Sequence, residues 1–256
     1  MCFDELARPP IAPIQGGAID SGPLVLGADD GSLLRAFAAR GGKPSKVAII
    51  ILPDVRGLHP YYEELAVRFA ERGIDAVAID YFGRTAGVAE RDQGFDFMAH
   101  VARTTFAGLA ADVSAAADLL RSAGGGDARS IFTIGFCFGG RLAFLSATLG
   151  LDLAGVIGFY GSPVGPTRND MPAPADVAGR IRSPVLAIFG GADEGIPSSA
   201  IATFRAALER AGVDNRLVSY EGAPHSFFDR RAADYAKASE AAWTETVDFV
   251  RAHSSS

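Results

Sequence analysis

The sequence predicts an α/β protein whose mostly parallel sheet is covered by helices on both faces. Continuous β-branched runs such as residues 47–52 (VAIIIL) are typical of parallel strands that are buried on both sides. Amphipathic segments with helical spacing follow these runs, and short glycine-containing turns separate them. Strands that alternate regularly with helices indicate βαβ units, which place parallel strands in one sheet.

Each element is expected where an apolar run or a helical period occurs. Short runs at 24–26 and 33–37 predict an antiparallel hairpin at the front of the chain. The predicted core strands are residues 47–52, 76–79, 130–134, 155–159, 185–189 and 216–220. The predicted helices are residues 61–72, 107–121, 140–148, 199–211 and 233–252. We expect one domain over residues 1–256, with an extended N-terminal arm at 1–20 and a frayed tail at 253–256.

The composition excludes several classes of protein. The chain has 256 residues, 48% of them hydrophobic, which is enough for a self-sufficient core. Its net charge of −6 disfavours nucleic acid as a partner, because that binding depends on neutralising phosphates. It has no apolar run of the roughly 18 residues that span a bilayer, and no secretory signal peptide. We expect a cytoplasmic monomer or small homo-oligomer that binds a small molecule and neither nucleic acid nor membrane.

Neither a metal nor an organic cofactor is expected. The two cysteines, Cys2 and Cys137, are too few for a disulfide framework or a structural zinc site. The sequence contains no dinucleotide-binding glycine motif after a strand, no phosphate-binding loop and no histidine-rich cluster.

The most informative segment is IFTIGFCFGGRLAF at residues 131–144. An apolar strand runs into Gly135-Phe-Cys137-Phe-Gly139, and helix-forming residues follow at once, which is the nucleophile elbow with cysteine in place of serine. The helix N-terminus lowers the pKa of a thiol there and supplies N–H donors for an oxyanion. We predict that Cys137 is a nucleophile; the alternative is an inert buried cysteine at a strand–helix turn.

A thiol nucleophile needs a base, and the chain has four histidines. His225 lies in a loop after the last predicted strand, at the sheet edge where the elbow also lies. Hydrolases with this elbow place the nucleophile, the acid and the histidine in that chain order, which His225 satisfies. His59 comes too early, His100 lies in a predicted lid helix and His253 in the tail. We predict that His225 is the base.

The acid is expected after the strand at 185–189. Asp193 stands just beyond that strand, in the turn GGADEG. Its carboxylate would accept the second imidazole N–H and stabilise the imidazolium. Glu194 is adjacent, and a solvated turn aspartate is the alternative, but the turn favours Asp193.

The segments GFCFGG, FGGAD and GAPHSF resemble those of dienelactone hydrolases (carboxymethylenebutenolidases), cysteine members of the α/β-hydrolase fold. The resemblance covers residues 48–250 and implies that Cys137 is the nucleophile, Asp193 the acid and His225 the base. It also implies that Asp54, in the stretch PDVRG, restrains the thiol at rest and helps to ionise it. The family has the longer glutamate there, so Asp54 is also open to the interpretation of an ordinary turn or N-cap residue.

The resemblance further implies an oxyanion hole made by the backbone N–H groups of Val55 and Phe138. Members acting on dienelactone bind its carboxylate with two arginines, but Asp229 stands four residues after the histidine, where one arginine is expected. The lid segment offers Arg84, Arg91 and Arg103 without a decisive match. An aromatic-lined pocket is the other possibility. The predicted substrate-binding residues are Phe82, Arg84, Tyr160, Phe228 and Arg230.

These features predict a thiol-based hydrolase of lactones or small carboxylic esters, acting through a thioester. A general carboxylesterase of the same scaffold, acting on small aryl or acyl esters, is the first alternative. A non-catalytic relative that binds a metabolite is the second. A redox-active thiol protein is the third, although Cys2 is remote in sequence and no C-x-x-C occurs.

Overall fold

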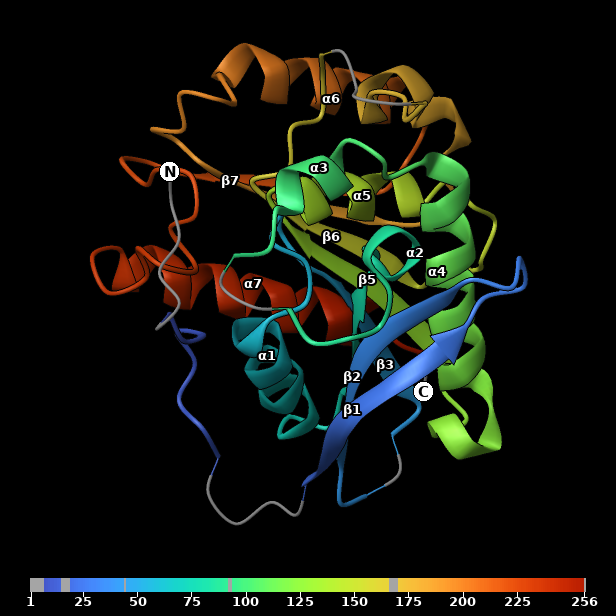
Figure 1. The fold of residues 1–256 in the computed structure, drawn as a ribbon. Coiled ribbons are helices and arrows are strands. Elements are labelled where there is room, and N and C mark those ends of the chain that lie inside the picture. The colour runs from blue at the N-terminus through green and yellow to red at the C-terminus, as the bar shows by residue number, and fades with distance from the viewer. Residues whose placement is uncertain (1–6, 15–18, 44, 92–93, 166–169, 256) are drawn as a thin grey trace.

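The computed structural model describes residues 7–14, 19–43, 45–91, 94–165 and 170–255, and its strands form one eight-stranded sheet (Figure 1). The strand order is β1-β2-β4-β3-β5-β6-β7-β8. Strands β1 (Ile19–Gly27) and β2 (Leu33–Gly41) pair antiparallel, and β2 also runs antiparallel to β4. All other pairs are parallel. The predicted α/β class and the front hairpin are confirmed.

The parallel strands occupy the centre of the sheet. They are β3 (Val47–Leu52), β4 (Asp75–Asp80), β5 (Ser130–Phe136), β6 (Gly155–Phe159), β7 (Val185–Gly190) and β8 (Asn215–Tyr220). Every residue of β4, β5, β6 and β7 is buried, which requires helices on both faces. Strand β8 lies at the edge and is only partly buried.

Helices cover the sheet in two layers (Figure 1). The α-helices are α1 (Pro60–Ala70), α2 (Gly83–Ala86), α3 (Phe97–Val101), α4 (Phe106–Arg121), α5 (Phe138–Ser146), α6 (Ser198–Arg210) and α7 (Ala236–His253). Short 3₁₀ turns occur at Ala123–Gly125 and Pro174–Arg180. Helices α1 and α7 share one face, where the rings of Phe69 and Trp243 lie 4.8 Å apart. Helices α5 and α6 meet on the other face through Phe144 and Phe204.

Both described chain ends contact the rest of the protein. The tail was expected to fray, but α7 continues to His253 and the Ser255 N–H donates to Ser130 Oγ at 2.9 Å. In the arm, Ile11 is buried and Arg8 pairs with Glu64 at 3.1 Å, so residues 7–14 lie against α1. Residues 1–6, 15–18 and 256 lie outside the described residues, and residues 19–20 belong to β1. No helix among the described residues is long and apolar enough to cross a membrane.

Direct backbone packing places α5 against the sheet. A Cβ built on Gly139 would lie 2.1 Å from the Leu52 carbonyl oxygen and 2.2 Å from that of Pro53. A Cβ on Gly135 would lie 1.9 Å from the Gly139 carbonyl oxygen. Backbone atoms cannot move aside as a flexible side chain can, so these positions require glycine. The helix therefore begins directly beside the end of β3.

We predict that Gly139→Ala lowers the free energy of unfolding by about 2–4 kcal/mol, because the added methyl group overlaps two carbonyl oxygens. Urea unfolding followed by circular dichroism measures the change. Gly22→Ala in β1 is the matched control, because a Cβ there meets nothing within 4 Å, and it should shift stability by less than about 0.5 kcal/mol. Equal stability of the two variants would contradict the packing described here.

Candidate active site

Cys137 lies at the turn between β5 and α5 with φ of 56° and ψ of −114°. This conformation is strained for a residue with a side chain, and such strain concentrates at functional sites. The Cys137 N–H donates to the Phe159 carbonyl at 3.0 Å, which fixes the turn. The thiol is free and partly exposed. The turn has the form of the predicted nucleophile elbow.

Two loops at the same edge of the sheet bring His225 and Asp193 together. Asp193 follows β7, and His225 follows β8. The His225 Nδ1 atom lies 2.6 Å from Asp193 Oδ2, and because a carboxylate accepts, Nδ1–H is the donor. The second carboxylate oxygen accepts the Gly195 N–H at 2.9 Å, which fixes the Asp193 side chain. Glu194, by contrast, is exposed.

The proton of His225 is held tightly. Burial alone would lower the pKa of His225, but the hydrogen bonds with Asp193 and Cys137, and the charges of those groups, raise it to about 10. The Tyr160 ring lies 4.9 Å from the imidazole, centre to centre, and covers it. The structure thus brings the predicted base and acid into hydrogen-bond contact, and the predicted nucleophile is close enough to raise the pKa of His225.

The predicted oxyanion donors are the backbone N–H groups of Phe138, which follows Cys137, and Val55, in the loop after β3. Phe138 is the first residue of α5, where a backbone N–H has no acceptor within the helix. Within the described part of the protein, neither the Phe138 nor the Val55 N–H donates a hydrogen bond to another residue. Both groups are therefore free to bind an oxygen atom of another molecule.

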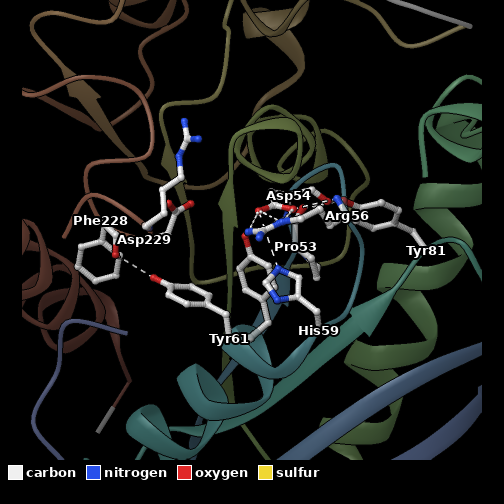
Figure 2. A network of polar contacts seen from close by, with 10 residues as sticks. Pro53, Asp54, Arg56, His59, Tyr61, Tyr81, Phe228 and Asp229 are labelled. Carbon is white, nitrogen blue, oxygen red and sulfur yellow. Dashed lines mark hydrogen bonds and ion pairs between the residues drawn. The ribbon is translucent and has the colours of Figure 1, made fainter. Parts of the chain in front are cut away.

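Asp54 is held by Arg56 (Figure 2). The Arg56 Nη2 atom lies 2.5 Å from Asp54 Oδ2, Nε lies 3.1 Å from both carboxylate oxygens, and the Arg56 N–H donates to Oδ1 at 2.8 Å. Burial would raise the pKa of Asp54, but His59 and Arg56 keep it below its ordinary range. His59 Nε2 is 3.9 Å from the carboxylate, too far for a hydrogen bond, so Arg56 is the main partner.

Two buried tyrosines complete the turn at residues 53–57. The Asp54 N–H donates to the Tyr62 hydroxyl oxygen at 3.0 Å. The Tyr81 hydroxyl lies 2.6 Å from the Pro53 carbonyl oxygen and 2.5 Å from that of Asp54, which accept its hydrogen. Two interpretations of Asp54 were predicted, a role at the thiol and an ordinary turn residue, and its bond with the Arg56 N–H fits the second. The places of Arg56, Tyr62 and Tyr81 in this turn were not predicted from sequence. Among its described contacts, the Asp54 carboxylate meets Arg56 and His59.

The predicted aromatic residues differ in their surroundings. Phe228 is fully buried, and its ring lies 4.8 Å from that of Phe159, so it packs in the core. Phe82 is also fully buried, 4.9 Å from the Tyr81 ring. Tyr160, in contrast, contacts His225, and its buried hydroxyl has no hydrogen-bond partner among the described residues. Of the three, Tyr160 is placed directly against His225.

The two predicted arginines, Arg84 and Arg230, differ in their partners. Arg84 donates to Asp112 at 2.9 Å and pairs with Asp30, contacts that attach α2 to α4 and to the front hairpin. These contacts give Arg84 a structural role. Arg230 forms no ion pair among the described residues, and its buried Nε has no acceptor there.

The described residues contain no group of three or more histidine, cysteine, aspartate or glutamate side chains that could hold a metal ion. They also line a depression of about 520 Å³ at Tyr220, Glu221 and residues 233–238, which contains none of the predicted site residues.

A parallel sheet with antiparallel strands at its front, a strained nucleophile turn and a histidine–carboxylate pair after the last two strands define the α/β-hydrolase class. The dienelactone hydrolase family model matches residues 34–254. The chain belongs to the dienelactone hydrolase family, as its sequence motifs predict, and is a hydrolase.

Several relatives support this membership. A protein of Methylorubrum extorquens named "Putative carboxymethylenebutenolidase" is 30% identical over 96% of this chain and 87% of its own length. The crystal structure titled "Putative Dienelactone Hydrolase" from Klebsiella pneumoniae has a TM-score of 0.81, with 27% identity over 91% of this chain and 99% of that one. The dienelactone hydrolase-like phosphotriesterase P91, from metagenomic libraries, shares the fold at 23% identity, with a TM-score of 0.76, over 93% of this chain and all of its own.

We predict that the imidazole of His225 stays protonated well above pH 7 and titrates near pH 10. A raised pKa means that the folded state binds the proton more tightly than the unfolded chain. The stability that this proton binding contributes is therefore present below about pH 6.5 and lost as pH rises through about 10. Nuclear magnetic resonance of the ring nitrogens measures the titration. Cys137→Ala should lower the pKa, and a His225 that titrates near 6.5 in the wild type would contradict the interaction of its imidazole with Asp193 and Cys137.

Proposed function

We propose that the protein hydrolyses a lactone or small carboxylic ester through a Cys137–His225–Asp193 triad and a thioester intermediate. The observation that carries the proposal is the hydrogen bond between His225 and Asp193 at the sheet edge where Cys137 occupies its strained turn, together with the effect of Cys137 on the pKa of His225. Three groups from three separate loops meet there, in the order that this class of hydrolase uses. Family membership supports the same reaction.

The proposed reaction has two halves. In the first, the thiolate of Cys137 attacks the carbonyl carbon, and the carbonyl oxygen becomes an oxyanion held by the N–H groups of Val55 and Phe138. The oxyanion collapses, the bond to the leaving oxygen breaks, and His225 donates its proton to that oxygen, which leaves a thioester. In the second half, His225 takes a proton from water, and the hydroxide attacks the thioester. The acid leaves, and the thiolate and imidazolium are restored.

A thiolate suits this reaction because it expels activated oxygen leaving groups well, whereas it expels an amide nitrogen poorly on this scaffold. Enol esters, lactones and aryl esters are therefore the expected substrates, and peptides are not. Relatives are named as carboxymethylenebutenolidases, which supports a lactone. The alternative is a general carboxylesterase acting on small aryl or acyl esters. Arg84 is paired with Asp30 and Asp112, which favours this alternative over a lactonase that binds a substrate carboxylate through Arg84.

The proposed role of Asp54 is to hold the turn that carries Val55. Its carboxylate accepts the N–H and the guanidinium of Arg56, so it closes the turn around the Val55 N–H. This role needs no direct contact with the thiol. Of the predicted binding residues, Tyr160 is proposed to cover the substrate beside His225, and Arg230 to lie at the rim of the site.

We predict that Cys137→Ala abolishes hydrolysis of 4-nitrophenyl acetate while the circular dichroism spectrum stays unchanged. Cys137→Ser should fold but turn over far more slowly, because a hydroxyl is much less ionised than a thiol at neutral pH. Alkylation by iodoacetamide should inactivate the wild type in proportion to the modification of Cys137. Retained turnover in a folded Cys137→Ala variant would remove the triad and leave a binding role for the pocket.

We predict that His225→Ala lowers kcat by about 10³-fold or more, as loss of a triad base does. His59→Ala is the matched control, because His59 lies in the neighbouring loop but outside the hydrogen-bonded chain of the triad. It should lower kcat by less than about ten-fold. Steady-state kinetics with one activated aryl ester compares them, and an inactive His59 variant beside an active His225 variant would reverse the assignment.

A further inference from the structure

Two loops place buried charges beside the triad. Asp54 and Asp229 are each 6% exposed, one on the loop after β3 and the other on the loop after His225. Figure 2 shows Asp229 next to the Asp54–Arg56 pair, on its separate loop. The loops touch where the Tyr61 hydroxyl donates to the Phe228 carbonyl at 2.9 Å. Arg56 therefore has a carboxylate from each loop close to its guanidinium.

The charge of Asp229 reaches the reacting groups. The positive charges of Arg56 and His225 both lower the pKa of Asp229, although burial raises it overall to about 6. Burial, and then the charges of Asp229 and Cys137, raise the pKa of Tyr160, whose ring covers His225. Asp229 and the Cys137 thiol thus act on one buried phenol. The side chain of Asp229 itself accepts only one hydrogen bond among the described residues, from the Arg230 N–H.

The charges around the nucleophile sum to a negative value. Asp54 and Asp229 provide two carboxylates against the single guanidinium of Arg56. The triad adds a further negative charge whichever way its protons lie. A thiolate, an imidazolium and the Asp193 carboxylate carry the same total as a thiol, a neutral imidazole and that carboxylate. For Asp54, Asp229, Arg56 and these three groups, no arrangement of the protons among Cys137, His225 and Asp193 makes the sum positive.

The nearby arginines do not reverse this sign. Arg84 is paired with Asp30 and Asp112, and Arg91 lies 2.9 Å from Asp80. Arg141 donates to the carbonyl oxygens of the loop at 162–172. Arg230 donates its backbone N–H to Asp229, and its guanidinium forms no ion pair among the described residues. A full positive charge on Arg230 would still leave the sum of these charges negative.

We propose that Asp229, together with the Asp54–Arg56 pair, makes this site selective for uncharged esters or lactones and excludes substrates with a carboxylate near the reacting carbonyl. The inference rests on the proposed function for the identity of the reaction, but the charge selection is a property of the site itself. A carboxylate brought next to buried like charges loses its hydration and meets repulsion, and one pKa unit of such repulsion corresponds to a ten-fold effect. Because the groups are buried, salt should screen the repulsion only weakly.

Alkylation of Cys137 tests the charge selection without any ester. Iodoacetamide is neutral and iodoacetate is an anion of nearly the same size. The selectivity ratio is the rate constant for iodoacetamide divided by that for iodoacetate, measured at Cys137 by mass spectrometry of its peptide. We expect this ratio to exceed that of N-acetylcysteine amide by about ten-fold or more. A ratio equal to or below that of the free thiol would overturn the inference, because it would show a neutral or positive site.

Variants assign the effect to Asp229. Asp229→Asn should lower the ratio by about five-fold or more, because it removes a negative charge without changing shape. Asp234→Asn is the matched control, since that carboxylate lies on the same loop, exposed and paired with Arg231 at 2.8 Å, and its ratio should stay that of the wild type. If Asp229→Asn fails to fold by circular dichroism, the wild-type ratio still decides. Equal ratios for the two folded variants would contradict the role of Asp229.

The pH dependence gives a third readout. Asp229 faces Asp54 and Arg56 from the loop after β3, Tyr61 from α1, Tyr160 from the end of β6, and His225 from its own loop. Because the pKa of Asp229 is about 6, the wild-type ratio should rise as pH rises through this value. Both reagents react with the same thiolate, so the pH dependence of thiol ionisation cancels in the ratio. The Asp229→Asn ratio should be flat over the same range, and a parallel rise in both proteins would contradict the assignment.

The same contrast applies to turnover. Mono-4-nitrophenyl glutarate and its methyl ester differ in one charge, and kcat/KM should favour the methyl ester by about ten-fold or more after correction for the uncatalysed rates. Hydrolysis of both at equal rates, abolished by Cys137→Ala, would overturn the charge selection and leave the proposed function standing. Selective alkylation without hydrolysis of any ester would overturn the proposed function and leave the charge selection standing.

Discussion

The contact of α5 with the end of β3 through Gly139 is the constraint on which the site depends. Without a side chain at this position, the helix backbone reaches the carbonyl oxygens of Leu52 and Pro53. The chain must then turn sharply between β5 and α5, which gives Cys137 its positive φ and leaves the Phe138 N–H without an acceptor. The same contact fixes the start of the loop that carries Val55. One backbone approach thus places the proposed nucleophile and both proposed oxyanion donors.

The proposed acid and base are placed by a second contact of the same kind. A Cβ on Gly190, the last residue of β7, would lie 2.4 Å from the Ala223 carbonyl oxygen and 2.6 Å from that of Pro224. The Ala192 N–H donates to the Ala223 carbonyl at 2.9 Å. The loops after β7 and β8 therefore lie backbone against backbone, and the short distance from Asp193 to His225 follows. Rigid backbone contacts hold a triad more precisely than side-chain packing does, because carbonyl oxygens have no rotamers.

The sequence predicted these features to the extent that local patterns encode them. The period of the apolar residues gave the central strands and long helices, and the glycines around Cys137 gave the turn, because both depend on neighbours in the chain. Contacts between distant residues are not encoded in this way. Arg84 was predicted to bind substrate, yet its partner Asp112 lies 28 positions away. The partners of Asp54 were also missed, although Arg56 stands only two residues further on. The sequence alone does not show toward which carboxylate a long arginine side chain turns.

The Asp54–Arg56 pair also allows a buried carboxylate to lie in the loop that carries Val55, one of the proposed oxyanion donors, without an uncompensated charge. A lone buried carboxylate near Cys137 would oppose the thiolate by repulsion, and its own burial would be unfavourable. Arg56 neutralises it and at the same time donates its backbone N–H to it, so the charge pair is also the closure of the turn. Burial of an ion pair contributes little net stability, but it fixes geometry where one partner is part of the backbone turn. The pair therefore fixes the position of the Val55 N–H without a net charge at the thiol, and the remaining negative charge of the site comes from the loop that follows His225.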